Sequence, residues 1–522
     1  MRLLPRPATL AALFLTGCVH APVDLEGRLA PCVAGYVQVG EACFRGGFDA
    51  SLRDARDAVD ASPDASIDVS ALLDAPDAAL ACIDFTCDGN TLVNCITSER
   101  VGCPGGCMVR EGQGACDFAP SFVGCDAPVG AADIVIGPGE IWALDTNRPG
   151  DLRGATSTRV FQGAGRPSLR VISMRSLVVE EGGTIRPLRA SMLRDLVDTE
   201  LETRDVLVLY VATTAVIRGR IDVSALGSLA GAGSVRICDA ACGNGGFDDG
   251  FGDGGGGGGA GAGRGGGGGA PQYCGSSGCG LGDDATRHCL CLDGTSLRHG
   301  RGGEALTPTF LVGGAHGGLG GADNRVDAAR GMCRSESTDA GAGGGAVMLV
   351  AGSHVLIDRT GILVSHGGGG GHGDQKRAGG GGGAGGTIVV EAPIIDLQGR
   401  LMAHGGAGGT AGSCGTCDAT CPRLLGNSPG GDDDGGALAT LPLPSSSHRG
   451  GTGAMGSTSA SIDGRTALQN SGSGADGDSG GGGGGAGRIT LRSVVPAPDE
   501  LALRSSPGST WVALEGAAGC GR

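Results

Sequence analysis

Aromatic side chains, lysine and long apolar runs are scarce in this chain. Its 522 residues include 2 Trp, 3 Tyr and 10 Phe, so a hydrophobic core must be built from Val, Ile, Leu and Ala. The single lysine, Lys376, follows Gln375. Because a phosphate-binding P-loop needs its lysine directly after a glycine, that motif is excluded. No segment has the 18 or more consecutive apolar residues that a membrane-spanning helix needs.

Glycine is abundant instead, and 109 glycines with 23 prolines make up about a quarter of the residues. Both residue types break helices, which nearly excludes a helical protein. The 39 basic and 55 acidic residues give a formal net charge of -16. This is the wrong sign for holding nucleic acid or an anionic membrane surface. We therefore expect no nucleic-acid partner.

The first 18 residues have the order of an export signal. Arg2 and Arg6 precede an apolar stretch from Ala8 to Leu15, and the sequence Leu15-Thr16-Gly17-Cys18 ends it. This order resembles the lipobox of bacterial lipoproteins. The resemblance implies that residues 1–17 are removed and that Cys18 is the lipidation site. A cleaved signal with an incidental cysteine is the alternative.

If Cys18 is lipidated, the protein would bind the membrane through its N-terminal lipid. Several acyl chains on one residue suffice for stable anchoring. Val19 stands where an Asp in such lipoproteins tends to signal inner-membrane retention. The resemblance therefore favours the outer membrane and leaves open its periplasmic or its cell-surface face.

Cysteine counting points to an oxidising compartment. Without Cys18, the 21 cysteines leave 20, an even number that favours disulfides. Seven cysteines lie from Cys82 to Cys125 and eleven from Cys238 to Cys520. Both counts are odd, so full pairing requires a bridge between groups, and Cys125 is our candidate for it. Zinc is the alternative for the first group, but that segment has no His and no paired C-x2-C units.

Changes in composition divide the chain into five parts. Their boundaries are 1–17 for the signal peptide, 18–48 for a lipid-anchored N-terminus with a small Cys32 to Cys43 loop, 49–81 for a disordered Asp/Ala-rich linker, 82–125 for a disulfide-rich module and 126–522 for a Gly-rich β-repeat domain. The linker repels itself and lacks an apolar stripe, which makes it a spacer rather than a helix. The module is too small for a core of its own and needs its bridges.

Repeated strand-like units are the most informative feature of the last part. Residues 357–368 align without gaps on 395–406, and the preceding limbs 347–351 and 388–392 align at an offset of 41. A third copy is 217–223, a degenerate copy runs from 169 to 185, and 488–492 is a final half unit.

One such unit cannot bury its apolar side, whereas stacked copies can. The repeats therefore predict an all-β fold of stacked short strands, a parallel β-helix-like solenoid with long Gly-rich loops. An antiparallel sandwich is the alternative, but no Asn-Gly hairpin turn joins the limbs.

Glycine runs lie beside these units, for example 254–259, 379–383 and 480–485. They can be flexible loops, which the entropy of fixing glycine favours. They can also be extended chains with three residues per turn, packed side by side, because glycine alone lets backbones touch.

Catalytic and cofactor motifs are nearly absent. Gly426-Asn427-Ser428-Pro429-Gly430 fits a nucleophile elbow, but it sits in a Gly/Pro loop and is expected by chance. His366 and His404 occupy one repeat position and would form a metal-binding ladder if units stack directly, although solvent-facing strand ends are favoured. We predict no catalytic residue, no cofactor and no metal site. Calcium is a weak alternative at the acidic glycine-rich loops, which are Asp248, Asp249 and Asp253, then Asp432 to Asp434, then Asp476 and Asp478.

The whole pattern resembles predicted Gly-rich, Cys-rich surface lipoproteins of GC-rich Gram-negative bacteria. We expect a non-enzymatic, lipid-anchored cell-envelope protein for structural or adhesive surface display, with an extracellular polysaccharide or protein as ligand. One alternative is a polysaccharide-acting β-helix lyase or hydrolase, which Asp358 and Asp396 in one groove with Arg residues would favour. The other is a Gly-rich surface that binds ice or matrix.

Overall fold

A computed structural model gives the backbone and side chains of most of the chain after residue 84. It divides into two units, Met1–Ala79 and Leu80–Arg522, and each is described by itself. The described residues are 85–110, 112–126, 130–148, 150, 152–164, 166–188, 205–234, 242–243, 256–268, 300–306, 309–321, 339–373, 378–411, 462–467, 480–496, 504–507 and 509–514, with the backbone alone at 36–39, 42–45, 280–281, 288–290 and 296–298.

The first unit is described only as a strand pair. β1 (Tyr36–Val39) and β2 (Ala42–Arg45) are antiparallel. Cys18, the signal peptide and the Asp/Ala-rich linker lie outside the described residues.

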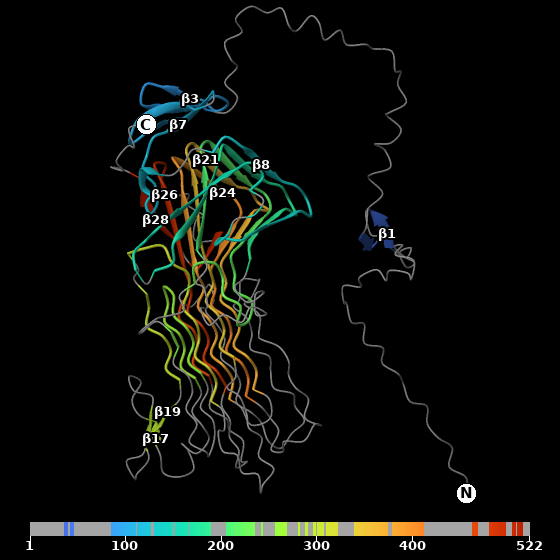
Figure 1. Ribbon diagram of the computed structural model, residues 1–522, viewed down its shortest axis with the longest axis vertical. Helices are drawn as coiled ribbons and strands as arrows, with labels where there is room; N and C mark the ends of the chain where they lie inside the picture. The colour runs from blue at the N-terminus through green and yellow to red at the C-terminus, as the bar shows by residue number, and fades with distance from the viewer. Residues whose placement is uncertain are drawn as a thin grey trace, which may run out of the picture. The chain divides into compact units, whose positions relative to one another are not determined.

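Three sheets dominate the second unit, and nearly all of their pairing is parallel (Figure 1). The seven-stranded sheet has the order β10-β11-β14-β20-β23-β26-β28, and only its first pair is antiparallel. Its strands are β10 (Thr156–Val160), β11 (Leu169–Met174), β14 (Val206–Val211), β20 (Ala346–Ala351), β23 (Thr387–Glu391), β26 (Arg488–Ser493) and β28 (Thr510–Ala513).

The other two sheets are parallel throughout. The five-stranded sheet consists of β24 (Ile394–Leu397), β21 (His354–Ile357), β15 (Thr214–Ile217), β12 (Ser176–Val179) and β8 (Asp133–Ile136). The six-stranded sheet consists of β27 (Ser505–Ser506), β25 (Arg400–Met402), β22 (Ile362–Val364), β16 (Arg220–Asp222), β13 (Thr184–Pro187) and β9 (Ile141–Leu144).

Each full sequence repeat supplies one strand to each sheet, and each strand pairs with its counterpart in the next repeat. Val347 pairs with Ile388 as the offset of 41 predicts. Gly219, Gly361 and Gly399 form one column, because the Ile362 amide donates to the Gly219 carbonyl and the Arg400 amide to the Gly361 carbonyl. The prediction of stacked, parallel short strands with almost no helix is confirmed.

The structure corrects two details of the repeat alignment. Residues 357–368, predicted as one continuous limb, contain the end of β21 and all of β22. These two strands belong to the five-stranded and the six-stranded sheet. In the first of these sheets Ile357 lies opposite Leu397 rather than Ile395. The turn after β21 is two residues longer than the turn after β24. The pairing of β21 with β24 is therefore shifted by two residues from the predicted alignment, whereas the pairing of β22 with β25 keeps the predicted offset.

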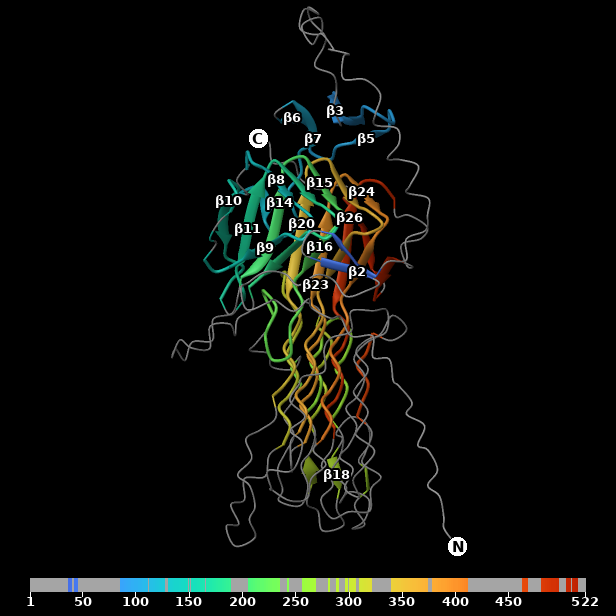
Figure 2. The ribbon, with the colours of Figure 1, turned by 90° about the vertical axis from the view of Figure 1, so that its right-hand side faces the viewer.

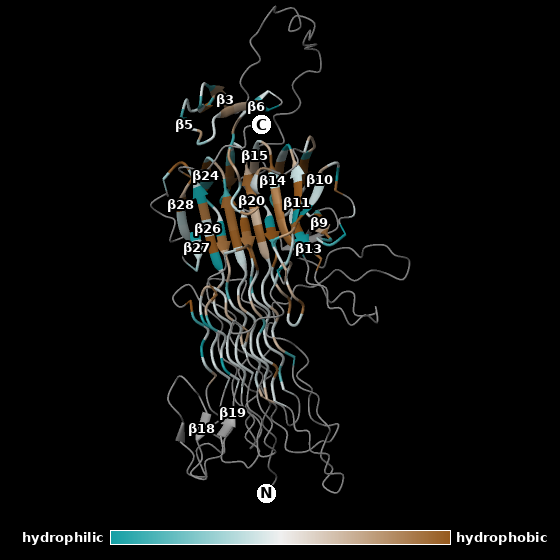
Figure 3. Cartoon of the chain, turned by 60° about the vertical axis from the view of Figure 1, so that its left-hand side comes forward, coloured by the Kyte–Doolittle hydropathy of each residue, from teal (hydrophilic) through white to brown (hydrophobic). Residues whose placement is uncertain are grey.

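Aliphatic side chains from all three sheets fill the space between them. The core cluster includes Leu209, Leu349, Ile357 and Leu401, each 0% exposed. Figure 3 shows the apolar residues concentrated in the strands. The predicted Val, Ile, Leu and Ala core is confirmed, and strand burial on both faces explains the near-continuous apolar runs.

The disulfide-rich module packs on the seven-stranded sheet. Its elements are β3 (Phe85–Asp88), β4 (Thr91–Asn94), β5 (Arg100–Gly102), β6 (Cys107–Arg110), β7 (Gln113–Cys116) and a 3-10 turn at Gly124–Asp126. Disulfides join Cys87 to Cys107 and Cys103 to Cys116. The predicted presence of bridges in this module is confirmed, while the sequence left their pairing open.

A second core cluster joins this module to the sheet. It includes Phe85, Leu92 and Phe118 of the module with Val208 and Met348 of the sheet. Cys95, Cys125 and Cys242 are also disulfide-bonded. The interdomain pairing predicted for Cys125 stays a prediction.

Glycine-rich segments continue from the strands as extended chains that run side by side (Figures 1 and 2). We call the chains 256–268, 300–306, 311–321, 339–345, 365–373, 378–386, 403–411, 462–467 and 480–487 the glycine bundle. In chain 378–386, the amides of Gly380, Gly381 and Gly382 donate to three different chains, and the next three residues donate to the same three chains in the same order. The acceptors are the carbonyls of Gly371, Gly318 and Gly482, then of Gly368, Ala315 and Gly485.

The same chain accepts hydrogen bonds from three further chains, so six neighbours surround it. The donors are the amides of Gly256 and Gly259, of Gly406 and Gly409, and of Gly341 and Gly344. A repeat of three residues is that of an extended polyproline II-type helix, which has no hydrogen bonds within the chain. These described runs are therefore buried and bonded to one another, and the flexible-loop interpretation is wrong for them.

Close approach, rather than an unusual backbone angle, requires glycine in the bundle. A Cβ atom on Gly383 would overlap the carbonyl oxygen of Ala342, and one on Gly481 would overlap that of Gly380. The glycines with left-handed φ angles, such as Gly139 and Gly182, lie at strand turns outside the bundle. Glycine thus replaces a side-chain core by direct backbone contact.

A small antiparallel sheet lies on an insertion between bundle chains. It consists of β17 (Gly280–Leu281), β18 (His288–Leu290) and β19 (Ser296–Arg298). Within the described residues, no helix has the length and apolar character needed to cross a membrane.

Candidate functional site

An open groove lies on the outer face of the seven-stranded sheet, the face that carries Thr387, Val389 and Glu391. Its volume is about 480 Å³. The disulfide module covers much of this face, and the groove lies where that cover ends, towards β26 and β28. It is lined by Ser121, Phe122, Phe310, Leu311, Thr387, Val389, Arg488, Thr490, Arg492 and Val512. We call it the outer groove.

Strand alternation places the polar side chains of the outer groove. Arg488, Thr490 and Arg492 are alternate residues of β26, so they point to one face. Their inward-pointing partners, Ile489 and Leu491, belong to the aliphatic core. In register, Arg488 lies beside Thr387, and Arg492 lies between Glu391 and Val512.

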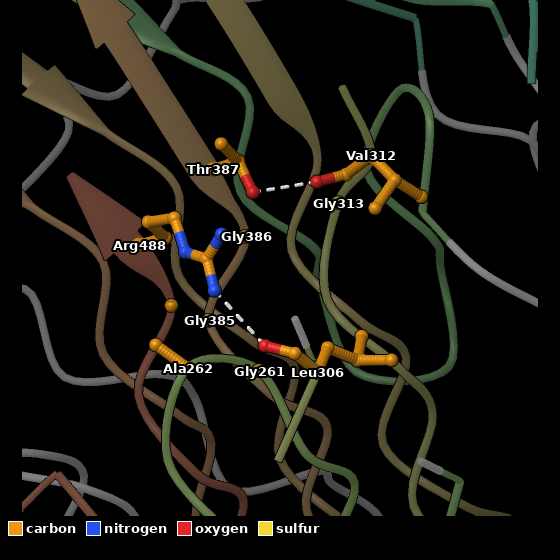
Figure 4. A pocket seen from close by; sticks show the side chains of 10 residues that line it. Gly261, Ala262, Leu306, Val312, Gly313, Gly385, Gly386, Thr387 and Arg488 are labelled. Atoms are coloured by element: carbon orange, nitrogen blue, oxygen red, sulfur yellow. Dashed lines mark hydrogen bonds between the residues drawn. The ribbon is translucent and has the colours of Figure 1, made fainter. Parts of the chain in front are cut away.

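Each of the two arginines is held in place by a hydrogen bond or an ion pair. Arg488 Nη2 donates to the Leu306 carbonyl at 3.0 Å, and Thr387 Oγ1 donates to the Val312 carbonyl at 2.5 Å. Figure 4 shows these two bonds around a small cavity of about 10 Å³, where sheet strands pass into bundle chains. Arg492 Nη1 bonds Glu391 Oε1 at 2.8 Å. A guanidinium has five N–H donors, and each of these contacts uses one of them.

Glu391 is the buried acid beneath the groove, with 0% of its side chain exposed. The Ser121 amide donates to Glu391 Oε2 at 3.0 Å, and the Ser121 hydroxyl donates to Oε1. Burial raises the pKa of Glu391, while Ser121 and Arg492 act in the opposite direction. Glu391 therefore links the disulfide module to β23 and orients Arg492.

Two half-buried phenylalanines flank the groove. Phe122 comes from the disulfide module, and Phe310 comes from the segment before Leu311. The Arg166 guanidinium stacks over the Phe310 ring, 4.2 Å from its centroid. The groove thus combines apolar ring surfaces, threonine hydroxyls and guanidinium donors.

The paired histidines meet inside the protein. The rings of His366 and His404 stack with centroids 5.2 Å apart, and the exposed fractions of the two residues are 2% and 0%. The solvent-facing position predicted for them is wrong, because the chain continues past both residues into the glycine bundle. The alignment of the two histidines from successive repeats is confirmed, whereas their role as metal ligands is not tested.

The ladder does not form a metal centre with a third ligand. His366 Nδ1 accepts the His404 amide at 3.1 Å. Burial, and next the neighbouring His404, lower the pKa of His366 to about 3. Among the described residues, no group of three or more His, Cys, Asp or Glu side chains could hold a metal ion.

Asp358 and Asp396 have different bonding partners. Asp358 Oδ2 lies 3.3 Å from Arg218 Nε, whereas Asp396 Oδ2 accepts from Gln398 at 2.9 Å. The predicted calcium loops and the 426–430 motif lie outside the described residues.

The outer groove was missed by sequence analysis, although a signal for part of it is present. The final half unit 488–492 alternates Arg, Ile, Thr, Leu, Arg, which places two arginines on one side of a strand. Ser121 and Phe310 reach the groove through long-range packing that no local pattern predicts.

The residues that line the outer groove are arginine, threonine, serine and apolar side chains. Glu391, the acid beneath the groove, is buried and bonded. No protein-family model, curated protein or solved structure matches this chain.

Proposed function

We propose that this is a non-enzymatic, lipid-anchored cell-envelope protein that displays a binding surface, with the outer groove as that surface. The observation that carries the proposal is the lining of the groove, where arginine, threonine and phenylalanine side chains surround an open space without a carboxylate pair. Fixed polar donors beside aromatic rings are what a binding site needs for orientation and contact area.

The oxidised module supports the cellular location. Bridges such as Cys87–Cys107 persist in exported proteins and are rare in the cytosol. The lipobox-like sequence at Cys18 supplies the anchor in this proposal, and the outer membrane is the expected address. The Asp/Ala-rich segment 49–81 would then separate the binding unit from the lipid surface.

We infer further that the repeats are coils of a β-helix-type solenoid with an added glycine bundle. The support is the parallel pairing of each strand with its counterpart one repeat later in three sheets. The bundle lets each coil extend far beyond the sheets without a side-chain core, because its backbone groups bond to neighbouring chains.

Lipidation is tested by growing cells with labelled palmitate and comparing the natural protein with Cys18→Ser. Label in the natural protein and none in the variant supports the anchor. Display is tested by treating intact cells with protease and identifying the released peptides by mass spectrometry. Release of peptides after residue 82 supports the cell-surface face, whereas their protection places the protein in the periplasm.

A further inference from the structure

We propose that the outer groove binds an acidic oligosaccharide through the carboxylates of its sugars. The inference rests on the proposed function, since it names the ligand class of the same groove. It also makes a prediction in solution that does not depend on where the protein is displayed.

Local charge is the first argument. The chain as a whole has a formal net charge of -16, yet the groove gathers Arg488 and Arg492, with Arg166 at the Phe310 ring. The acid that pairs with Arg492 is Glu391, and its side chain is fully buried. The groove is therefore a positive site on a negative molecule, and an anionic ligand is complementary to it.

Orientation is the second argument. Arg492 is fixed by Glu391 and has 24% of its side chain exposed. Arg488 is fixed by the Leu306 carbonyl. Guanidinium groups bind carboxylates in a two-point geometry, and less entropy is lost when their side chains are already ordered. Both arginines are thus prepared for a carboxylate.

Spacing is the third argument. Arg488 and Arg492 are four residues apart on one strand, which separates their Cα atoms by roughly 13 Å at the usual strand rise. A single amino acid or a small dicarboxylate is too short to contact both. A ligand that uses both arginines must be a chain of several units.

The available donors favour a sugar chain over a peptide. β26 pairs with β23 on one side and β28 on the other, so its backbone groups cannot add a peptide strand. Recognition along β26 therefore uses side chains, and the groove offers Thr490 for sugar hydroxyls and Phe122 and Phe310 for the apolar faces of sugar rings.

The test is isothermal titration of the full chain with tetragalacturonate, with its methyl ester as an uncharged ligand of the same backbone. We expect tetragalacturonate to bind, at least tenfold more tightly than the ester. A hexaglutamate peptide is the third probe. Absence of tetragalacturonate binding, equal affinity for the ester, or equal affinity for the peptide would overturn the proposal.

Glutamate substitutions of two exposed valines, one in the outer groove and one outside it, test where the ligand binds. Val512→Glu puts a carboxylate beside Arg492 in the groove, and Val135→Glu puts one on β8, which does not line the groove. Both positions are exposed, at 38% and 54%. We expect Val512→Glu to weaken tetragalacturonate binding at least tenfold and Val135→Glu to leave it unchanged, with equal melting temperatures. An equal effect of both substitutions would contradict binding in the groove. These titrations are made in solution, so their result does not depend on the outcome of the display experiment.

Discussion

Single glycines in the bundle lie where a Cβ atom would overlap the backbone of a neighbouring chain. Overpacking a core usually costs roughly 1–3 kcal/mol. Gly383→Ala should destabilise the protein by at least this amount, because the added methyl meets the Ala342 carbonyl rather than a movable side chain. Gly102→Ala is the control, because a Cβ there meets nothing within 4 Å. Urea unfolding of both variants measures the difference, and equal midpoints would contradict backbone-to-backbone packing.

His366 gives the protein a dependence on pH. Its pKa in the folded protein, about 3, is below the ordinary value of 6.5, so the unfolded chain binds the proton first. The contribution of His366 to stability should be complete above about pH 6.5 and fall as the pH drops towards 3, by roughly 1.4 kcal/mol per pH unit.

His366→Asn removes this titration and keeps an acceptor near the position of Nδ1, which receives the His404 amide. Chemical unfolding between pH 7 and pH 4 should show a shallower loss of stability in the variant. Parallel curves for the two proteins would show that His366 does not stay neutral in the fold.

Some of these residue positions could be read from the sequence. The column of Gly219, Gly361 and Gly399 and the stacking of His366 on His404 both follow from the repeat offsets. The burial of the histidines could not be read, because it depends on the glycine chains that continue beyond them. Glu391 likewise needs Ser121, 270 positions away, to explain its place in the core.

At the scale of elements, the disulfide module and the seven-stranded sheet share one core. The Cys103–Cys116 bridge closes a separation of 13 residues within that core. Replacing both cysteines by alanine should lower the free energy of unfolding by about 3 kcal/mol, the usual value for a loop of this length. The variant should also bind a hydrophobic dye, because loosening the module uncovers Val208 and Met348.

The measurement is urea unfolding of the double variant beside the natural protein, with dye fluorescence recorded below the unfolding transition. A drop in stability without dye binding would mean that the module stays on the sheet when this bridge is absent. No change in either quantity would contradict the shared core.

The sequence predicts the strand repeats better than it predicts the turns between them. Val347–Ala351 and its partner limb keep the offset of 41, because buried β-branched runs fix their register. Ile357 pairs two positions away from its aligned residue, since turn length varies without leaving an apolar signal. The outer groove combines Ser121, Phe310 and Arg488 from distant segments, and only three-dimensional packing brings them together.

At the scale of the whole second unit, the three sheets and the glycine bundle are consecutive regions built from the same chains. The sheets are held by an aliphatic core, and the bundle is held by hydrogen bonds between glycine chains. Since the same chains pass from one region to the other, we expect the two to unfold together in one transition. Separate transitions would mean that the bundle is an independent unit of stability.

Amide hydrogen exchange in the peptide that covers residues 378–386 tests the central claim most directly. The account predicts that its glycine amides are protected about as strongly as those of β23, because nearly every one donates to a neighbouring chain. Exchange of these amides at the rate of an unstructured glycine peptide would contradict it.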